Sequence, residues 1–351
     1  MRLHVFNPEH DIALAFNRRH LTMPHAAQEL RMNLGWIPLL WASEDDLILV
    51  DDVAYSQKAS CKFKRDSSVH FIGWDELAGI PIEAVDPWGW DITLRTSLVE
   101  HGLSPKVLPT EQALSEIRKL SSRYETLRAL DVLRDGLVNE TCGKNRYLST
   151  EEQVLETIRE WRRVVLKAPW SSSGRGIRYV CNEMTSSVSG WVRRILEIQG
   201  GVMAEPYYNK VRDFGMEFFV HEDGLVDYLG LSVFQTMNHA YTGNLIASEE
   251  EKAQILGAYI PLTLINTIKY RICEYFSSRM RNHYKGPFGI DMMIVARPDS
   301  QGFLLHPCVE INVRRTMGHV ALSLSSSENA SRQLMRIEHD VNYRLKVTPA
   351  P

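Results

Sequence analysis

Three segments of the chain carry side chains whose types and spacing could bind an anion and a metal ion. The first, residues 164–176, reads Val-Val-Leu-Lys-Ala-Pro-Trp-Ser-Ser-Ser-Gly-Arg-Gly. A strand that ends at Lys167 and continues into a loop of small residues offers one ammonium and several backbone N–H groups to an anion such as phosphate. A surface hairpin with Lys167 extended toward solvent is the alternative interpretation, because Gly and Ser also mark ordinary turns.

The second segment, residues 203–208, reads Met-Ala-Glu-Pro-Tyr-Tyr and is followed by Arg212-Asp213. A strand at this point can present backbone donors and acceptors to the edge of an adenine ring. Acidic side chains close to it can accept hydrogen bonds from ribose hydroxyls. A purely structural linker between two lobes is the alternative interpretation of this segment.

The third segment joins Asp291 with the later sequence Glu310-Ile311-Asn312. On a strand, Glu310 and Asn312 project from one face while Ile311 faces the other. If Asp291 faces the same way on a neighbouring strand, three hard oxygen ligands converge, and Mg²⁺ prefers such ligands. The alternative is a structural salt bridge in which Arg314 neutralises these acids.

Several familiar motifs are absent from the sequence. There is no G-x-x-x-x-G-K-[ST] segment, and Gly174-Arg175-Gly176 lacks the third glycine of a dinucleotide-binding fingerprint. Asp213-Phe214-Gly215 occurs without the other protein-kinase motifs, and no H-E-x-x-H sequence is present. These absences argue against a P-loop enzyme, a Rossmann dehydrogenase, a protein kinase and a zinc protease.

The elements that would hold these segments follow from the hydrophobic pattern. In the first 105 residues, short apolar runs alternate with amphipathic stretches, which predicts a small parallel-sheet lobe. The predicted strands there are residues 3–6, 37–41, 47–50 and 69–72, and the predicted helices are residues 26–34 and 93–100.

The rest of the chain predicts two mixed lobes. Thr150 is a predicted N-cap of a helix that ends near residue 161. The expected helices are 111–133, 188–198 and 248–283, the last one split or kinked at Pro261. The expected strands are 164–167, 177–181, 201–206, 217–221, 225–234, 288–295 and 303–311, and the tail from residue 347 is expected to be frayed. The domains are predicted to be residues 1–108, 109–204 and 205–351.

Composition places the chain among globular proteins. It has 351 residues, 44% of them hydrophobic and 24% charged, with a net charge of −3. This charge does not favour nucleic acid or a membrane surface as a partner. The longest apolar run spans residues 257–268, which is short of the roughly 20 residues needed to cross a bilayer. Five dispersed cysteines predict reduced thiols in a cytoplasmic protein.

Taken together and in this order, the three segments resemble the ATP-grasp superfamily over residues 110–320. The resemblance implies an α/β fold in which two α+β subdomains clamp a nucleotide, preceded by a small α/β domain. It also implies roles for individual residues. Phosphate contacts would come from Arg123, Lys167 and the loop Ser172, Ser173, Gly174, Arg175 and Gly176; adenine and ribose contacts from Glu205, Tyr207, Tyr208 and Asp213; Mg²⁺ or Mn²⁺ ligands from Asp291, Glu310 and Asn312.

The resemblance further implies an ATP-dependent ligase that joins a small-molecule carboxylate to an amine through an acyl phosphate. Lys167 and Arg314 would be its catalytic residues, with Arg314 stabilising charge on the phosphoryl group or the acyl intermediate. A non-catalytic nucleotide-binding module and a phosphotransferase are the alternatives on the same fold. The sequence does not reveal the oligomeric state, and a homodimer is expected only because dimers are the commonest oligomers.

The acceptor site is left open by the sequence. Asn7-Pro8-Glu9-His10-Asp11 follows the first predicted strand, at the edge where open parallel sheets bind ligands. The loop could contact a substrate, or it could be a plain turn in which Asp11 caps the next helix. Arg315 and His319 are further candidates for binding a substrate carboxylate.

Overall fold

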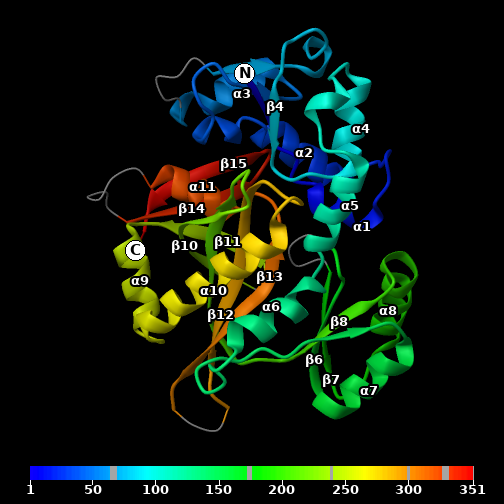
Figure 1. Ribbon diagram of the computed structural model, residues 1–351, viewed down its shortest axis with the longest axis vertical. Helices are drawn as coiled ribbons and strands as arrows, with labels where there is room; N and C mark the ends of the chain where they lie inside the picture. The colour runs from blue at the N-terminus through cyan, green and yellow to red at the C-terminus, as the bar shows by residue number, and fades with distance from the viewer. Residues whose placement is uncertain (64–68, 172–175, 238–239, 299–300, 326–331, 351) are drawn as a thin grey trace. The chain divides into compact units, whose positions relative to one another are not determined.

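The computed structural model describes residues 1–351 except 64–68, 172–175, 238–239, 299–300, 326–331 and 351. The chain divides into two compact units. The first contains Met1–Arg118, Thr242–Ser248 and Arg314–Pro351, and the second contains Lys119–Tyr241 and Glu249–Val313. Each unit combines helices with sheets, so the predicted α/β class is confirmed (Figure 1). The two boundaries between the three predicted domains stay predictions.

The first unit begins with a four-stranded parallel sheet. Its strands are β1 (Arg2–Val5), β2 (Leu47–Leu49), β3 (His70–Ile72) and β4 (Ala84–Pro87), in the order β3-β2-β1-β4. The predicted parallel sheet is therefore confirmed, but the strand expected at residues 37–41 is wrong. Ile37–Leu40 is a 3-10 helix, because Pro38 has no N–H to pair and its fixed φ suits a first helical turn. Strand β4 was missed because only Val85 gives it an apolar signal.

Helices and a second small sheet complete this unit. The helices are α1 (His10–Phe16), α2 (His25–Leu34), α3 (Val53–Ser60), α4 (Ile92–Glu100), α5 (Glu111–Leu120), which leads into the second unit, and α11 (Met317–Leu324). Strand β11 (Ala240–Ile246) pairs with β14 (Gln333–His339), which pairs in turn with β15 (Tyr343–Pro349). The expectation of a frayed tail from residue 347 is wrong, since Val347 lies opposite Met335 and both contact the same apolar core.

The second unit contains a small lobe that carries Lys167. Its sheet has the order β5-β8-β6-β7, from β5 (Arg146–Leu148), β6 (Arg163–Lys167), β7 (Ile177–Cys181) and β8 (Val202–Pro206). Helices α7 (Glu151–Trp161) and α8 (Ser186–Gln199) pack on it through buried aliphatic side chains. Thr150 caps α7 by accepting a hydrogen bond from the Gln153 backbone N–H, and β6 and β7 form an antiparallel hairpin; both predictions are confirmed.

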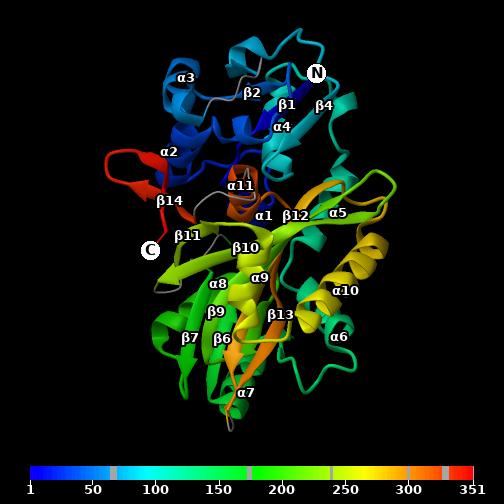
Figure 2. The ribbon, with the colours of Figure 1, turned by 90° about the vertical axis from the view of Figure 1, so that its left-hand side faces the viewer.

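The other part of the second unit is built on four long antiparallel strands. Within the unit their order is β13 (Phe303–Asn312), β12 (Gly286–Ala296), β9 (Lys210–Val220) and β10 (Val226–Met237). Helices α9 (Glu249–Gly257) and α10 (Leu262–Met280) contact β10, and α6 (Glu125–Arg134) contacts β13 and α10 (Figures 1 and 2). None of the described helices combines the length and apolar character that a membrane span requires.

Two of the expected helices are each divided into two helices in the structure, and the split predicted at Pro261 is confirmed. Pro261 ends the first part of the helix expected at 248–283 and stands at the N-cap of α10, as its missing N–H allows. The helix expected at 111–133 is also two helices, α5 and α6, although no Pro or Gly lies between them. The break at residues 121–124 contains Arg123, whose contacts are described below.

One polar side chain lies in the core of the long sheet without a polar partner. His306 on β13 is fully buried, and neither of its ring nitrogens has a hydrogen-bond partner within the described residues. Burial, followed by the positive charges of Lys167 and Arg134, lowers the pKa of His306 from its ordinary value of 6.5 to about 3. The imidazole is therefore neutral in the folded protein at physiological pH.

Phe276 should be one of the most costly residues to truncate. Its ring is fully buried on α10 and packs against Phe288, which stacks on Phe218. Phe276→Ala is expected to lower the free energy of unfolding by about 3–5 kcal/mol, measured by urea denaturation. Tyr270→Ala on the same helix, where the ring is 71% exposed, should change it by no more than about 0.5 kcal/mol. Equal losses in the two variants would contradict this packing.

His306 should also give the protein a defined acid sensitivity. Between pH 6.5 and about 3 the unfolded chain binds a proton at this residue and the folded chain does not, so stability is lost as pH falls. His306→Phe removes this titration. Its free energy of unfolding should fall less steeply with decreasing pH, by up to about 1.4 kcal/mol per pH unit, in denaturation series from pH 7 to pH 4. Parallel pH profiles for the two proteins would contradict the assignment of a neutral, buried ring.

Candidate functional site

Arg123 joins two separate parts of the second unit. It lies in the break between α5 and α6 and is only 4% exposed. Its Nη1 donates to the backbone oxygen of Ala168 and to Ser171 Oγ, both at 2.7 Å, and its Nη2 donates to Glu310 Oε1 at 2.6 Å. The Arg123 backbone N–H also donates to the Pro169 oxygen at 3.0 Å. One guanidinium therefore connects the loop after β6 with strand β13.

Lys167 and Glu205 form a second buried ion pair. Nζ of Lys167 lies 2.7 Å from each carboxylate oxygen of Glu205, and both residues are 5% exposed. They face each other diagonally across the antiparallel strands β6 and β8, since Lys167 pairs with Met203 and Glu205 pairs with Val165. Lys167, whose ammonium was expected to bind phosphate, therefore contacts the carboxylate of Glu205, which belongs to the segment expected to bind adenine.

The three expected metal ligands lie together on β12 and β13. Asp291 is directly opposite Glu310, and Asn312 Nδ2 donates to Asp291 Oδ2 at 3.2 Å. Carboxylates directly opposite on neighbouring strands repel each other. The Arg123 guanidinium on Glu310 and the Asn312 amide on Asp291 reduce this repulsion.

A further carboxylate, Glu217, belongs to the same surface of the sheet. It lies on β9 next to β12, opposite Gly289, while Gly215 lies opposite Asp291. A Cβ atom at Gly215 would lie 3.5 Å from Asp291 Oδ1 and 3.6 Å from Glu217 Oε1, so both carboxylates flank this glycine. Glu217 is an acid inside an apolar strand, Phe-Gly-Met-Glu-Phe-Phe-Val, and this signal could have identified it from the sequence.

These side chains have the chemistry that a hard divalent cation needs, but the carboxylates alone do not complete a site. Within the described part of the chain, no group of three His, Cys, Asp or Glu side chains could hold a metal ion. Asp291 and Glu310 supply two carboxylates, and Asn312 adds an amide oxygen. Mg²⁺ commonly takes one or two protein carboxylates and completes its shell with waters and phosphate oxygens, so the residues fit that ion.

The segment expected to bind adenine lies beside a pocket. Tyr208 follows β8, and its ring meets the His306 ring edge-on, with centroids 5.5 Å apart. A cavity of about 510 Å³ is lined by Tyr208 together with Leu130, Arg134, Cys142 and Lys144. Burial raises the pKa of the Cys142 thiol to about 12 and also raises the pKa of Tyr208, so both groups are neutral. The cavity therefore combines an aromatic ring and a neutral thiol with the charged side chains of Arg134 and Lys144.

Tyr207 and Asp213 already have other contacts in the structure. The Tyr207 backbone N–H donates to the Arg163 oxygen at 2.9 Å, and the Arg163 guanidinium lies 4.2 Å from the centre of its ring. Asp213 Oδ2 accepts from Lys210 Nζ at 2.5 Å and from Thr236 Oγ1 at 2.6 Å. Their expected roles at the adenine and the ribose stay predictions.

The expected phosphate loop is described only at its two ends. Ser172, Ser173, Gly174 and Arg175 lie outside the described residues. At the ends, the Ala168 backbone N–H donates to the Gly176 oxygen at 2.8 Å. A Cβ atom at Gly176 would lie 2.1 Å from Ser171 Oγ and 2.2 Å from Ser171 Cβ, so a side chain cannot be accommodated there. The two ends of the loop therefore meet at the residue that Arg123 contacts.

Arg314 belongs to the first unit, whereas the other expected site residues belong to the second. Its Nε and Nη2 donate to the two carboxylate oxygens of Asp11 at 3.0 and 2.9 Å. Asp11 is therefore not the cap of α1, for which Glu9 occupies the N-cap position. Arg315 donates to Asp86 at 2.7 Å, and His319 accepts from the Thr316 backbone N–H at the start of α11.

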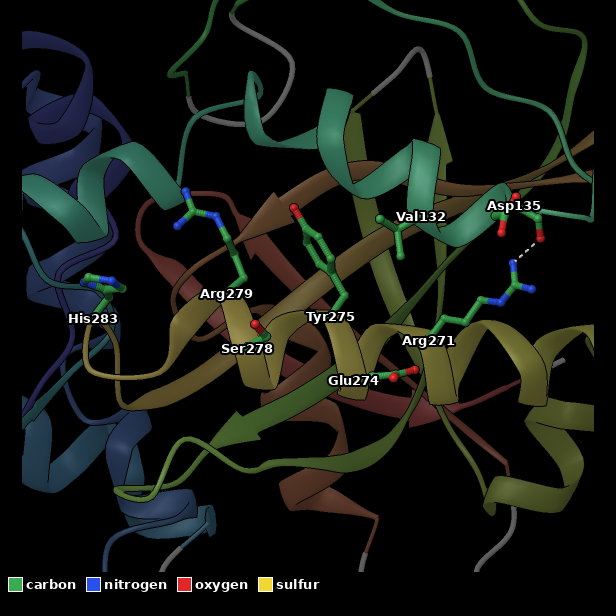
Figure 3. A pocket seen from close by; sticks show the side chains of 8 residues that line it. All are labelled: Val132, Asp135, Arg271, Glu274, Tyr275, Ser278, Arg279 and His283. Carbon is green, nitrogen blue, oxygen red and sulfur yellow. Dashed lines mark hydrogen bonds between the residues drawn. The ribbon is translucent and has the colours of Figure 1, made fainter.

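A larger pocket of about 560 Å³ lies between α6 and α10 (Figure 3). It contains Arg271 and Arg279, but both cations hold α6 in place. Arg271 Nη1 donates to the Asp135 backbone oxygen at 2.6 Å, and Arg279 donates to both carboxylate oxygens of Glu125 at 2.8 and 3.0 Å. The pocket is better explained by helix packing than by ligand binding.

No protein-family model and no curated protein matches the sequence. Three solved structures resemble the fold. Biotin carboxylase from Campylobacter jejuni matches with a TM-score of 0.49 and 16% identity, over 96% of this chain and 75% of that chain. N5-carboxyaminoimidazole synthetase from Staphylococcus aureus, complexed with ADP, gives 0.47 and 12%, over 96% and 82%. A protein from Archaeoglobus fulgidus assigned to the ATP-grasp superfamily gives 0.46 and 12%, over 100% of both chains. At such low identity, the proposed function rests on the contacts among this chain's own side chains and not on these similarities.

Proposed function

We propose that this protein is an ATP-grasp ligase that uses MgATP to join a small-molecule carboxylate to an amine. The observation that carries the proposal is the clustering of two buried cations, Arg123 and Lys167, with the oxygen ligands of β12 and β13. The buried thiol of Cys308 on β13 supports this clustering. Burial is the largest cause that raises the pKa of this thiol, and the negative charges of Glu205 and Asp291 raise it further, while Lys167 lowers it. The charged groups of these three residues therefore lie close to Cys308.

The two ion pairs suit a site that takes up a polyanion. Arg123 and Lys167 now neutralise Glu310 and Glu205. Phosphate oxygens can take the place of these carboxylates on the guanidinium and the ammonium, since Arg and Lys are the usual phosphate-binding side chains. Glu310 would then be available, with Asp291 and Asn312, to hold Mg²⁺ or Mn²⁺. Such an ion would neutralise charge on the phosphate oxygens.

The proposed reaction has two steps. A carboxylate oxygen of the substrate attacks the γ-phosphorus of ATP, and the bond from that phosphorus to the ADP oxygen breaks. The amine nitrogen then attacks the acyl carbon of the resulting acyl phosphate, inorganic phosphate leaves, and the nitrogen loses a proton. Lys167 and Arg123 hold the phosphates, and Arg314, two residues after Asn312, stabilises negative charge on the phosphoryl or acyl group.

This mechanism needs no side-chain nucleophile. The two buried cysteines, Cys142 and Cys308, have raised pKa values and are neutral thiols. All five cysteines, each within the described residues, are free of disulfides, which supports the proposed cytoplasmic location. The partners we propose are a small-molecule carboxylate and an amine, with a homodimer as the assembly.

Nucleotide binding should stabilise the folded protein in a metal-dependent way. At a hundredfold excess over its Kd, MgATP adds about 2.7 kcal/mol, which raises the midpoint of thermal unfolding. Asp291→Asn keeps the hydrogen bond from Asn312 possible but removes one negative charge, so the shift with MgATP should be at least halved. ATP with EDTA should give a smaller shift than MgATP in the native protein. The absence of any shift with ATP or ADP in the native protein would contradict the nucleotide site.

Glu310 should be required for turnover, and Glu310→Gln should remain folded although it is less stable than the native protein, because Arg123 loses its charged partner. Glu310→Gln is expected to lower MgATP-dependent release of inorganic phosphate at least a hundredfold. The substitution removes the negative charge of a proposed metal ligand and weakens the contact that holds the Arg123 guanidinium in place. Glu197→Gln, an exposed acid on α8, is the matched control and should retain native activity.

Product analysis with panels of carboxylates and amines separates the alternatives. ADP, phosphate and a new amide support the ligase, and nucleotide binding without any product supports a binding module. ADP with a phosphorylated substrate and no free phosphate supports a phosphotransferase. Native turnover in Glu310→Gln would overturn the proposed metal site.

A further inference from the structure

The first unit contains a pocket at the place where an open parallel sheet is best suited to bind a ligand. From β1 the chain adds β2 and then β3 on one side, and β4 then returns to the other side of β1. The direction of winding therefore reverses between β1 and β4. Ligands of such sheets bind outside the carboxyl ends of the strands at this switch point.

The pocket is formed by the residues that follow the four strands. Asn7 follows β1, Asp51 follows β2, Trp74 follows β3 and Asp91 follows β4, and all four line a cavity of about 350 Å³. This volume lies in the range of small-molecule sites. Leu21 and Met23 add apolar surface to its wall.

The pocket has more acidic side chains than basic ones. Three carboxylates, Glu9, Asp51 and Asp91, line it together with a single arginine, Arg31. Arg31 is shared between two of them, since Nη1 donates to Glu9 Oε1 at 2.7 Å and Nε donates to Asp51 Oδ2 at 2.9 Å. An anionic ligand would have to displace these pairs and would meet three negative charges. A cation is therefore the complementary ligand.

Nearly every carboxylate oxygen of the pocket already accepts a hydrogen bond. Asp51 Oδ1 accepts from Trp74 Nε1 at 2.9 Å. Asp91 Oδ1 accepts from the Leu94 backbone N–H at 2.9 Å, and its Oδ2 accepts from Asn7 Nδ2 at 3.2 Å. These two acids are held in place by the fold.

Glu9 is the exception. It is only 6% exposed, and among the described residues its Oε2 has no hydrogen-bond partner. Burial raises the pKa of this carboxyl group, and Arg31 offsets only part of that effect. Leaving a buried acceptor without a hydrogen bond destabilises the fold, so Oε2 calls for a donor brought by another molecule.

We infer that this pocket binds the cationic N–H group of a small organic molecule, an ammonium or a guanidinium, which donates to Glu9. The hydrocarbon part of the ligand packs against Trp74 and the apolar wall formed by Leu21 and Met23. Binding of the cation is a property of the first unit alone. That the bound compound is the amine that the enzyme ligates rests on the function proposed above.

The test uses the full-length protein without nucleotide and measures binding by isothermal titration calorimetry. The probes are n-pentylamine, n-pentylguanidine and the uncharged analogue 1-pentanol. At least one of the two cations should bind at least tenfold more tightly than 1-pentanol, and the tighter one identifies the preferred head group. Glu9→Gln should weaken binding of that cation at least tenfold, whereas Glu44→Gln, an exposed acid of the same unit, should leave it unchanged.

Two results would overturn the inference: equal affinity for 1-pentanol and both cations, or native affinity in a folded Glu9→Gln variant. If circular dichroism shows that Glu9→Gln is unfolded, Asp51→Asn takes its place. That variant lowers the negative charge of the pocket, so it should weaken the cations and leave 1-pentanol unaffected; equal changes for all three probes would then overturn the inference.

Asp291→Asn separates this inference from the proposed function. It should bind the cation as tightly as the native protein even though its response to MgATP is reduced. Cation binding in a protein that does not respond to MgATP would remove the proposed ligase and leave the inference standing. A response to MgATP without cation binding would do the opposite.

Discussion

The structure of the second unit depends on the compensation of two buried positive charges. Arg123 and Lys167 are each at most 5% exposed, and each is neutralised by a carboxylate, Glu310 and Glu205 respectively. Removing one partner of a buried pair leaves an uncompensated charge, which typically costs 3–5 kcal/mol. The break between α5 and α6 and the closed base of the loop after β6 follow from the same constraint, because both bring polar groups to Arg123.

A charge cluster of this kind is expensive for a purely structural purpose, since well-packed apolar residues would stabilise the unit as well or better. Its retention is easier to understand if the cations also meet a ligand.

The same constraint explains how such a site can accept phosphate and a divalent ion without a large rearrangement. In the proposed site, Arg123 and Lys167 would exchange carboxylate oxygens for phosphate oxygens, and Glu310 would exchange the Arg123 guanidinium for a metal ion. In this exchange Arg123, Lys167 and Glu310 would each keep a partner of opposite sign, so these three side chains would not meet the desolvation penalty of an unpaired buried charge. The side chains around the charge cluster do not interfere with this exchange because they are neutral. His306, Cys142 and Cys308 are held uncharged by burial, so they do not compete for the cations or the ligand.

The sequence predicted the local features of this arrangement and missed those that depend on packing. Lys167 before a Ser/Gly loop and the acids of β12 and β13 could be recognised because their spacing along single strands is visible in the chain. Pro261 marked a helix boundary by its own chemistry, whereas the break at Arg123 has no Pro or Gly and arises from contacts with Ala168, Ser171 and Glu310. The strand expected at residues 37–41 was wrong because a buried apolar run does not distinguish a strand from a short helix. Glu217 was missed because its position follows from strand register, and register depends on pairing between segments far apart in the sequence.

The candidate sites of the two units differ in the sign of the charges that they offer to a ligand, and this difference determines which ligands each can bind. In the second unit the buried cations face oxygen acceptors that a polyanion can replace. In the pocket of the first unit, three carboxylates share one arginine, and Glu9 keeps an acceptor without a donor among the described residues. A single ligand is not complementary to both, since a phosphate is repelled by the acids of the first unit and an ammonium is repelled by Arg123 and Lys167. Enzymes that condense an activated anion with an amine need both kinds of surface. The chain carries one of these two kinds of surface on each unit.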